Sequence, residues 1–521
     1  MYYTCAIFVL SVLTSNTYVS ASCVTDVNNN GSLVHAGKDS GTIEALLESS
    51  MSGDQYLLWA LDHTNAYDNA LFIPSTADPC EGIAFHWTVN PDTSGETSKG
   101  TINIAVAAQT LSEDGWVAIG FSETGGMRGA DVAYFTTLSE SLTDAHILDY
   151  LAHPITDQRQ DWVLNNHTIS DDGYIIFEAS RMLNTNDIFD RPFVDDSSVY
   201  VSDHKVIGAW GSSQYLGYHG NNRVRTSVQL YTSADSKAGL DYDIFLEEMA
   251  ARSEGSVKLG LSNYQIPQQQ TTYHEVCFTS NDFEKEGFFS DETPTQYVVG
   301  YEFIIDPETI KYMHHIVIYG SSSGCSTGAP VFVWTAGEDF LSFPNDTAMK
   351  FDVDGINSLT IQYHVDNADR DAGNVDNGSG IRLYYSSTPV TNEIGMMQIG
   401  DPNVNLDGFQ VGQGLTSYTF GCPSSCTQKK LSQDISIVKE LLHMHSYGER
   451  IVNQVYRDGE VVHESYVDYW DFDQSGSPAP QNEPFQVQRG DSFKTICYYN
   501  ADSSVKFGLG SEDEMCTFYN T

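Results

Sequence analysis

Short runs of strand-forming residues recur along most of the sequence, separated by turn-forming residues. Residues 85–89 and 101–107 are two of these runs, rich in Val, Ile and aromatic side chains. Such residues favour strands, and long amphipathic helical stretches are few. Asn-Gly and Asp-Gly pairs stand between later runs, where tight hairpins require them. The pattern therefore predicts a mainly β fold, built from β-sandwiches.

Length and charge bound the class of protein. At 521 residues the chain is too long for one hydrophobic core, so two or three domains are expected. Lysine and arginine number 25 against 70 acidic residues, and the net charge of −45 is spread along the chain. Such a surface repels phosphate backbones and anionic lipid, which argues against nucleic acid as a partner. We infer no site from the charge.

The first residues have features of an export signal. Residues 2–18 form a short apolar run, and small residues at 19–21 suit cleavage before Ser22, although the usual basic residue is missing. A transmembrane anchor is the alternative, but the run is short and broken by polar residues. No later segment offers about 20 consecutive apolar residues, so we expect no stable membrane insertion and a secreted or secretory-lumen protein. The glycosylation sequons fit export: Asn30, Asn166, Asn345 and Asn377.

The cysteine count is consistent with an oxidising compartment. There are nine cysteines, and removal of Cys5 with the signal leaves an even number. We therefore expect disulfides and no free thiol in the mature chain. Any metal would then be held mainly by His, Met or carboxylate side chains.

Three histidine groups lie in the second half of the sequence. The first is the pair His314-His315. Adjacent residues of a regular strand point to opposite faces, so both imidazoles can reach one metal only if the backbone is bulged or twisted. Taken alone, such a pair is more often two ordinary polar residues. A single histidine, His364, follows on another predicted strand, with Gln362 on the same face.

The third group is the motif His443-Met444-His445. On a strand this spacing puts both imidazoles on one face, as a clamp for zinc or copper, while Met444 points to the core. Met515 follows near the end of the chain. A lone methionine usually packs in a core, yet a thioether is the soft ligand that holds Cu(I) beside two imidazoles.

Together these motifs resemble the copper type II, ascorbate-dependent monooxygenases, the relatives of dopamine β-monooxygenase and of peptidylglycine α-hydroxylating monooxygenase. The resemblance covers about residues 264–519 and depends on six residues in the family's order. Residues 115–122 and 125–132 resemble a DOMON domain. A DOMON domain ahead of the copper module is the dopamine β-monooxygenase arrangement, which favours a small-molecule substrate.

The resemblance implies two copper ions per chain, with O2 as co-substrate and ascorbate as reductant. An electron-donating copper would be bound by His314, His315 and His364. The oxygen-activating copper would be bound by His443, His445 and Met515. In this family the two sites face each other across a solvent-filled cleft, which Gln362 and Tyr519 would line as further catalytic candidates.

The resemblance also implies disulfides between Cys277 and Cys325 and between Cys497 and Cys516. A second family cysteine near the histidine pair is replaced here by Ser321. Cys422 and Cys426 match a family Cys-x₃-Cys motif whose partners follow the position where this sequence stops. They could instead pair with Cys23 or Cys80, or with one another.

These features predict six regions. They are a signal peptide (1–21), a lead segment (22–79), a DOMON β-sandwich (80–235), a linker (236–262) and two jelly-roll-like β-sandwich copper subdomains (263–398 and 399–521).

Two other functions fit parts of the sequence. A secreted zinc- or copper-binding protein without turnover would use the five histidines, and Met515 argues against it because zinc gains little from a thioether. Alternatively, the DOMON region could be an electron carrier that binds haem b through Met127 and His219. DOMON domains attached to copper monooxygenases are not generally thought to carry haem, so we expect none. The substrate is not evident from the sequence.

Overall fold

The structure is a computed structural model. It describes residues 67–521 apart from 68, 76–80, 91–99, 111, 113, 150–152, 170–172, 195–203, 231–238, 307, 326–327, 336–338, 368, 401–409, 473–484 and 509–512. The predicted signal peptide, Cys23, Cys80 and the Asn30 sequon lie outside the described residues. The chain divides into two compact units, 1–244 and 245–521. Both are mainly β, as the sequence predicts.

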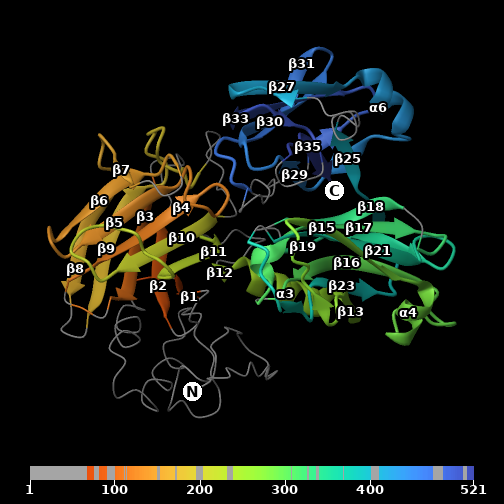
Figure 1. Ribbon diagram of the computed structural model, residues 1–521, viewed down its shortest axis with the longest axis horizontal. Helices are drawn as coiled ribbons and strands as arrows, with labels where there is room; N and C mark the ends of the chain where they lie inside the picture. Colours follow the sequence, from red (N-terminus) through yellow and green to blue (C-terminus); the bar gives the residue numbers. More distant parts are fainter. Residues whose placement is uncertain are drawn as a thin grey trace, which may run out of the picture. The chain divides into compact units, whose positions relative to one another are not determined.

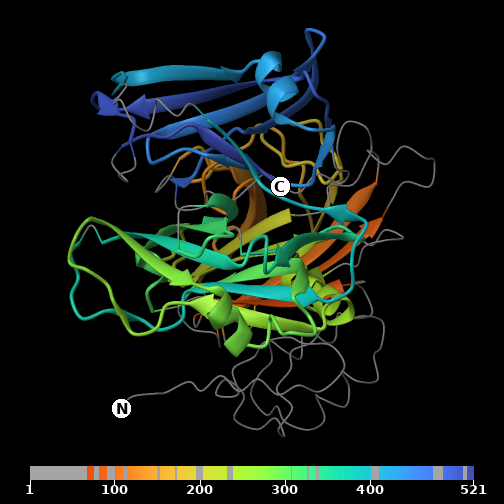
Figure 2. The same cartoon turned by 90° about the vertical axis from the view of Figure 1, so that its right-hand side faces the viewer.

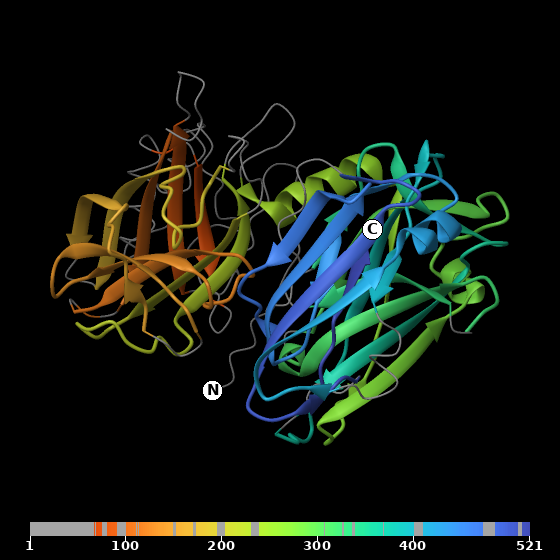
Figure 3. The ribbon, with the colours of Figure 1, turned by 90° about the horizontal axis from the view of Figure 1, so that it is seen from above.

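The first unit is a sandwich of two antiparallel sheets (Figures 1 and 3). One sheet has the order β1 (Asn69–Pro74), β2 (Gly82–Asn90), β3 (Thr101–Gln109), β9 (Tyr174–Met182), β8 (Val163–Ile169). The other runs β12 (Gly239–Leu240), β11 (Arg223–Gln229), β10 (His204–Gly211), β4 (Trp116–Ser122), β5 (Asp131–Thr136), β6 (Ser141–His146), β7 (Ile155–Thr156). Apolar side chains from both sheets, among them Phe85, Trp87 and Phe121, form one buried core. Strand β1 lies in the predicted lead segment and pairs with β2.

The first half of the second unit is another β-sandwich (Figure 2). The outer sheet is β13 (Gly255–Gly260), β23 (Gly380–Ser386), β16 (Thr295–Ile304), β20 (Thr347–Asp352) and β24 (Asn392–Glu393), with β19 (Phe340–Ser342) on β16. The inner sheet is β15 (Thr271–Phe278), β21 (Ser358–Asp366), β17 (Met313–Ser321) and β18 (Ala329–Thr335). The remaining elements are α3 (Asp241–Arg252), α4 (Ser280–Lys285), η2 (Ile310–Tyr312) and the pair β14 (Tyr264–Gln265) and β22 (Val375–Asp376). Ile316, Ile361 and Tyr363 of the inner sheet pack into the core between the layers.

The second half of this unit has its own core. Its main sheet is β27 (Gly414–Cys422), β33 (Ser492–Ala501), β30 (Gly448–Arg457) and β31 (Glu460–Val467), and a smaller one is β25 (Met397–Gly400), β35 (Thr517–Asn520) and β29 (Glu440–His443). Two strand pairs, β26 (Gln410–Val411) with β34 (Val505–Lys506) and β28 (Ile435–Ile437) with β32 (Phe485–Val487), and helix α6 (Ser424–Lys430) complete it. Met444 is fully buried in this core, as its predicted strand face required.

Two of the predicted disulfides are present. They join Cys277 to Cys325 and Cys497 to Cys516. Cys422 and Cys426 are thiols, so the expectation of complete pairing is wrong at these two positions. Burial, with a hydrogen bond to Cys426, raises the pKa of the Cys422 thiol to about 11. Among the described residues, no helix is long and apolar enough to cross a membrane.

Candidate metal centre

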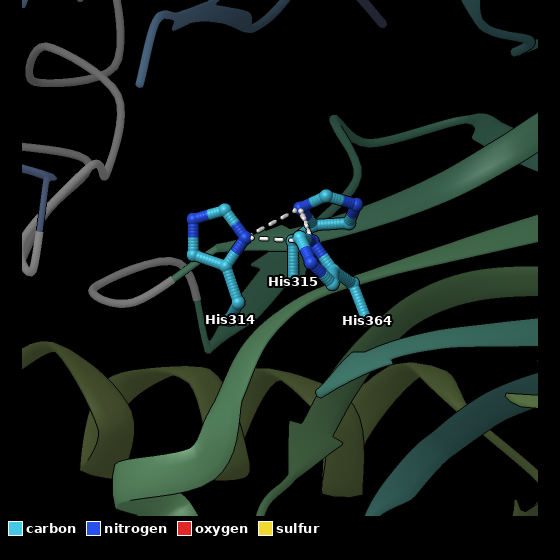
Figure 4. A group of neighbouring side chains, drawn as sticks. All are labelled: His314, His315 and His364. Atoms are coloured by element: carbon cyan, nitrogen blue, oxygen red, sulfur yellow. Dashed lines mark hydrogen bonds between the residues drawn. The ribbon is translucent and has the colours of Figure 1, made fainter. Parts of the chain in front are cut away.

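A β-bulge orients the two adjacent histidines of β17. In the pairing of β17 with β21, Met313 lies opposite Val365 and His315 lies opposite His364, so the register shifts at His314. The extra residue of a bulge breaks the alternation of side chains between the two faces. His314 and His315 can therefore turn toward the same point, which is the condition for both to bind one metal (Figure 4).

Three imidazole nitrogens converge at this bulge. The Nδ1 atom of His314 lies 2.8 Å from Nδ1 of His364 and 3.1 Å from Nδ1 of His315, and the remaining pair is 3.3 Å apart. A neutral imidazole has one N–H, so three nitrogens this close cannot all be paired with one another. Bonds from imidazole nitrogen to a metal are about 2 Å long, and this spacing suits three ligands of one ion. The residues therefore fit a metal.

The surroundings keep these histidines neutral, which is the form that binds metals. Burial is the largest cause, and it lowers the pKa of His314 and His315 well below the ordinary value; neighbouring histidines lower it further. Burial also lowers the pKa of His364 to about 3. Tyr273 stacks on His364, with ring centroids 4.5 Å apart. No local motif marks Tyr273, because only the pairing of β15 with β21 places it opposite His364.

The second pair of histidines also comes together. His443 is the last residue of β29, and its ring centroid lies 5.1 Å from that of His445. Burial lowers the pKa of His443 well below the ordinary value, and its buried Nδ1 atom has no hydrogen-bond partner among the described residues. The Nδ1 atom of His445 lies 3.0 Å from the carbonyl oxygen of Asp513, so it is the donor there and the other ring nitrogen is left for a metal.

The Met515 backbone lies beside this pair. Residue 517 pairs with His443 in the ladder of β29 and β35, so Met515 precedes that ladder by two residues. The side chain is 7% exposed. The backbone carbonyl oxygen of Met515 accepts a hydrogen bond from the Tyr499 hydroxyl at 2.7 Å. The adjacent Cys516 forms a disulfide with Cys497.

Gln362 and Tyr519 lie on the same two sheets but interact with other groups. The Gln362 amide donates to Glu275 Oε1 at 2.8 Å. The Tyr519 hydroxyl accepts from the Gln398 amide at 3.2 Å, and its ring packs in the cluster that contains Val317 and Leu441. Burial raises the pKa of Tyr519, with contributions from Tyr319 and Tyr273.

The two histidine sets adjoin each other. Ring centroids are 5.5 Å apart for His314 and His445 and 6.0 Å apart for His315 and His443. Phe472, which the sequence analysis missed, lies 4.4 Å from His314 and 6.0 Å from His445. The family resemblance implied a solvent-filled cleft between the sets. The apolar cluster of Val317, Val333 and Leu441 joins β17 and β18 to β29, and the expected cleft stays a prediction.

The fold and these neutral, convergent imidazoles are the features of a metalloprotein with histidine ligands. Residues 393–521 match the copper type II ascorbate-dependent monooxygenase C-terminal domain, and residues 93–202 match the DOMON domain. The chain is 24% identical over 78% of its length to DBH-like monooxygenase protein 1 of Homo sapiens, of which it covers 67%.

Two further relatives agree with this match. Dopamine beta-hydroxylase of Rattus norvegicus is 24% identical over 77% of the chain, which covers 66% of that protein. Tyramine beta-hydroxylase of Caenorhabditis briggsae is 23% identical over 77% of the chain, which covers 69% of it. The chain thus spans about two thirds of the length of these relatives. The matches support a dopamine β-hydroxylase-like copper monooxygenase with a DOMON domain.

Proposed function

We propose that this protein hydroxylates a C–H bond of a small organic substrate, with O2 as oxidant and ascorbate as reductant, and that it uses two copper ions per chain. The convergence of three neutral Nδ1 atoms at the β17 bulge carries this proposal. Support comes from the related hydroxylases, whose names refer to dopamine and tyramine. Both are phenylethylamines, so this is the first substrate class to test.

Each ligand set has a distinct role in this proposal. His314, His315 and His364 hold the copper that receives electrons from ascorbate. His443, His445 and Met515 hold the copper at which O2 is activated, where a thioether favours the reduced ion. When bound, copper supplies the change between Cu(II) and Cu(I) that dioxygen chemistry requires.

The protein prepares both sites before any metal arrives. Burial keeps the imidazoles of His364 and His443 neutral, and the Asp513 carbonyl oxygen orients the ring of His445. Phe472 and Tyr273 present aromatic surface next to the imidazoles, which limits the access of water. Gln362 and Tyr519 stay candidates for lining the substrate path.

A substrate panel tests the proposal. Copper-loaded protein is incubated with ascorbate and O2, in the presence of a phenylethylamine, a monoterpene or a sterol, and oxygen uptake and hydroxylated product are measured. We expect ascorbate-dependent product with at least one class. Two bound coppers without turnover on any of them would favour the non-catalytic metal-binding alternative, and zinc alone after copper reconstitution would contradict both copper assignments.

We further propose that the protein is exported. The apolar run at residues 2–18, the sequons and the disulfides Cys277–Cys325 and Cys497–Cys516 support this. The first residue of the purified extracellular protein checks it, with Ser22 expected. Absence of a Soret band in the same sample is the expected outcome for the DOMON domain.

A further inference from the structure

The regular pairing of β29 and β35 ends just before two of the proposed ligands. The ladder runs from Glu440 opposite Asn520 to His443 opposite Thr517. His445 and Met515 lie on the two segments that leave this ladder. Their relative position therefore depends on contacts other than the ladder itself.

One buried carboxylate links these two segments. Glu514 Oε2 accepts hydrogen bonds from the backbone N–H of His445 at 3.1 Å and of Met515 at 3.2 Å. Its Oε1 atom accepts from the backbone N–H of Tyr447 at 2.7 Å. The Glu514 side chain is fully buried, with 0% exposure. Beyond the end of the ladder, this carboxyl group therefore accepts the backbone hydrogen bonds that a strand partner would otherwise accept. Its donors come from both the His445 segment and the Met515 segment.

The cost of burying a carboxylate makes this arrangement informative. Buried carboxyl oxygens are tolerated only when hydrogen bonds replace their lost hydration, and here three backbone amides donate to the two oxygens of Glu514. The Glu514 backbone is also held, because its N–H donates to the Lys506 carbonyl and its own carbonyl accepts from the N–H of Gly508. The carboxylate is therefore an anchored acceptor, to which the His445 and Met515 amides are both tied.

We propose that Glu514 is a positioning residue that holds His445 and Met515 in the orientation needed to bind one copper ion. This inference rests on the proposed function, because it takes both residues as ligands. The hydrogen bond from the His445 ring to the Asp513 carbonyl acts in the same sense and orients the imidazole on the same segment. Loss of such an outer partner typically lowers metal affinity about 10- to 100-fold.

The variant Glu514→Gln tests this role with copper alone. The amide keeps the shape but replaces one acceptor oxygen with an NH2 group, which cannot accept from a backbone N–H. We expect the Cu(I)-loaded variant to lose the sulfur contribution to its X-ray absorption spectrum. We also expect about 10- to 100-fold weaker binding of one of its two coppers, while the other is retained.

Glu440→Gln is the matched control. Like Glu514, Glu440 has a buried carboxylate, and it lies on β29. It accepts hydrogen bonds from the side chains of Asn453 and His463, each at 2.9 Å, and, among the described residues, none from the backbone of a proposed ligand. We expect this variant to keep the sulfur contribution and both copper affinities, whatever its effect on stability. Loss of sulfur scattering in both variants would overturn a specific role for Glu514.

The remaining outcomes separate the two proposals. An unchanged spectrum and affinity in Glu514→Gln, with sulfur present in the wild type, overturns the role of Glu514 alone. A wild type without sulfur scattering overturns both the ligand assignment and this role. Sulfur loss in the variant, from a wild type with no turnover, supports the positioning role while contradicting the monooxygenase activity.

Hydrogen exchange of the wild type keeps the inference testable if Glu514→Gln does not fold. The backbone amides of His445, Tyr447 and Met515 should exchange slowly and together, because one carboxylate accepts all three hydrogen bonds. Rapid exchange at either segment would overturn the proposal.

Discussion

Two clusters of ionisable side chains, one in each unit of the chain, each bring three potential metal ligands close together. Asp131, Asp144 and Asp190 form the cluster in the first unit, and His314, His315 and His364 form that in the second. The two clusters differ in local charge, because the carboxylates of the first lie against an arginine side chain. The fully buried guanidinium of Arg181 lies 2.5 Å from Asp131 Oδ2 and 3.7 Å from Asp190 Oδ2.

Arg181 makes the carboxylate cluster a structural feature of the DOMON sandwich. Its guanidinium stacks over Trp162 and Phe193, at 4.8 and 4.7 Å from their ring centroids, and donates to the Arg191 carbonyl. The carboxylates therefore have a cation supplied by the chain. In the histidine cluster the imidazoles themselves are neutral, and their Nδ1 atoms converge on one point. These three residues therefore supply no positive charge of their own. The comparison teaches that close ligand atoms alone do not define a metal site, since the local charge balance also matters.

The replacement His364→Ala should have the largest effect. If the three histidines hold the electron-donating copper, removing one of their convergent Nδ1 donors should loosen that ion and deprive hydroxylation of its second electron. We expect bound copper to fall from two ions to one and hydroxylation to fall by roughly 10⁴-fold or more. Copper analysis and product formation measure both. Two tightly bound coppers in this variant would contradict the ligand role of His364.

Met515→Ile tests the other ligand set. If the thioether binds the oxygen-activating copper, product formation should fall by about 10³-fold, which corresponds to about 4 kcal/mol in the barrier. Ascorbate should still reduce the copper at His314, His315 and His364. If Met515 only packs in the core, the swap costs under about 1.5 kcal/mol of stability and activity survives. Full turnover would exclude the two-copper mechanism.

Arg181→Met tests the charge balance of the carboxylate cluster. Loss of the guanidinium leaves buried carboxylates without their partner, which should lower the free energy of unfolding by about 3–5 kcal/mol. Chemical denaturation measures the loss, and the copper content should not change. Arg159→Met is the control, because that side chain is half exposed and its replacement should change little. A fully stable Arg181→Met variant would refute the structural role.

Asp144→Asn should have a smaller effect, and of opposite sign. Burial, then the charges of Asp131 and Asp190, raise the pKa of Asp144 to about 7. The native state therefore takes up a proton, so this group's contribution to stability is greatest below the ordinary carboxyl pKa near 4 and is lost as pH rises through about 7. We expect the variant to be more stable than wild type at pH 8, on the order of 1 kcal/mol, with little difference at pH 4.

Thermal unfolding between pH 4 and 8 checks this prediction. Asp371→Asn offers a contrast, because hydrogen bonds from Lys311 and Tyr312 lower the pKa of Asp371. Its stabilising contribution is present above the ordinary carboxyl range, so its removal should destabilise the protein at neutral pH. Equal pH profiles for wild type and Asp144→Asn would contradict the effect of burial.

Much of the fold could be predicted, because alternation and turn residues are local. Strand-forming runs predicted the β-sandwich architecture, and the position of Met444 in the core followed from the spacing of its neighbours. Short motifs also pointed to the five histidines. The carboxylate cluster was missed because no motif joins its members: Asp131 begins β5, Asp144 belongs to β6, and Asp190 lies in the segment after β9.

The sequence by itself determined which side chains could bind a metal and in what order they occur, because that information lies in residue type and short spacing. From the sequence, His314 and His315 could share one metal only if the backbone was bulged or twisted at that point. The tertiary structure decided where that bulge falls, that His315 lies opposite His364, and that Tyr273, Phe472 and Glu514 surround the ligands. These contacts join residues far apart in the chain. Their geometry depends on the packing and strand register of whole sheets, which local spacing does not specify.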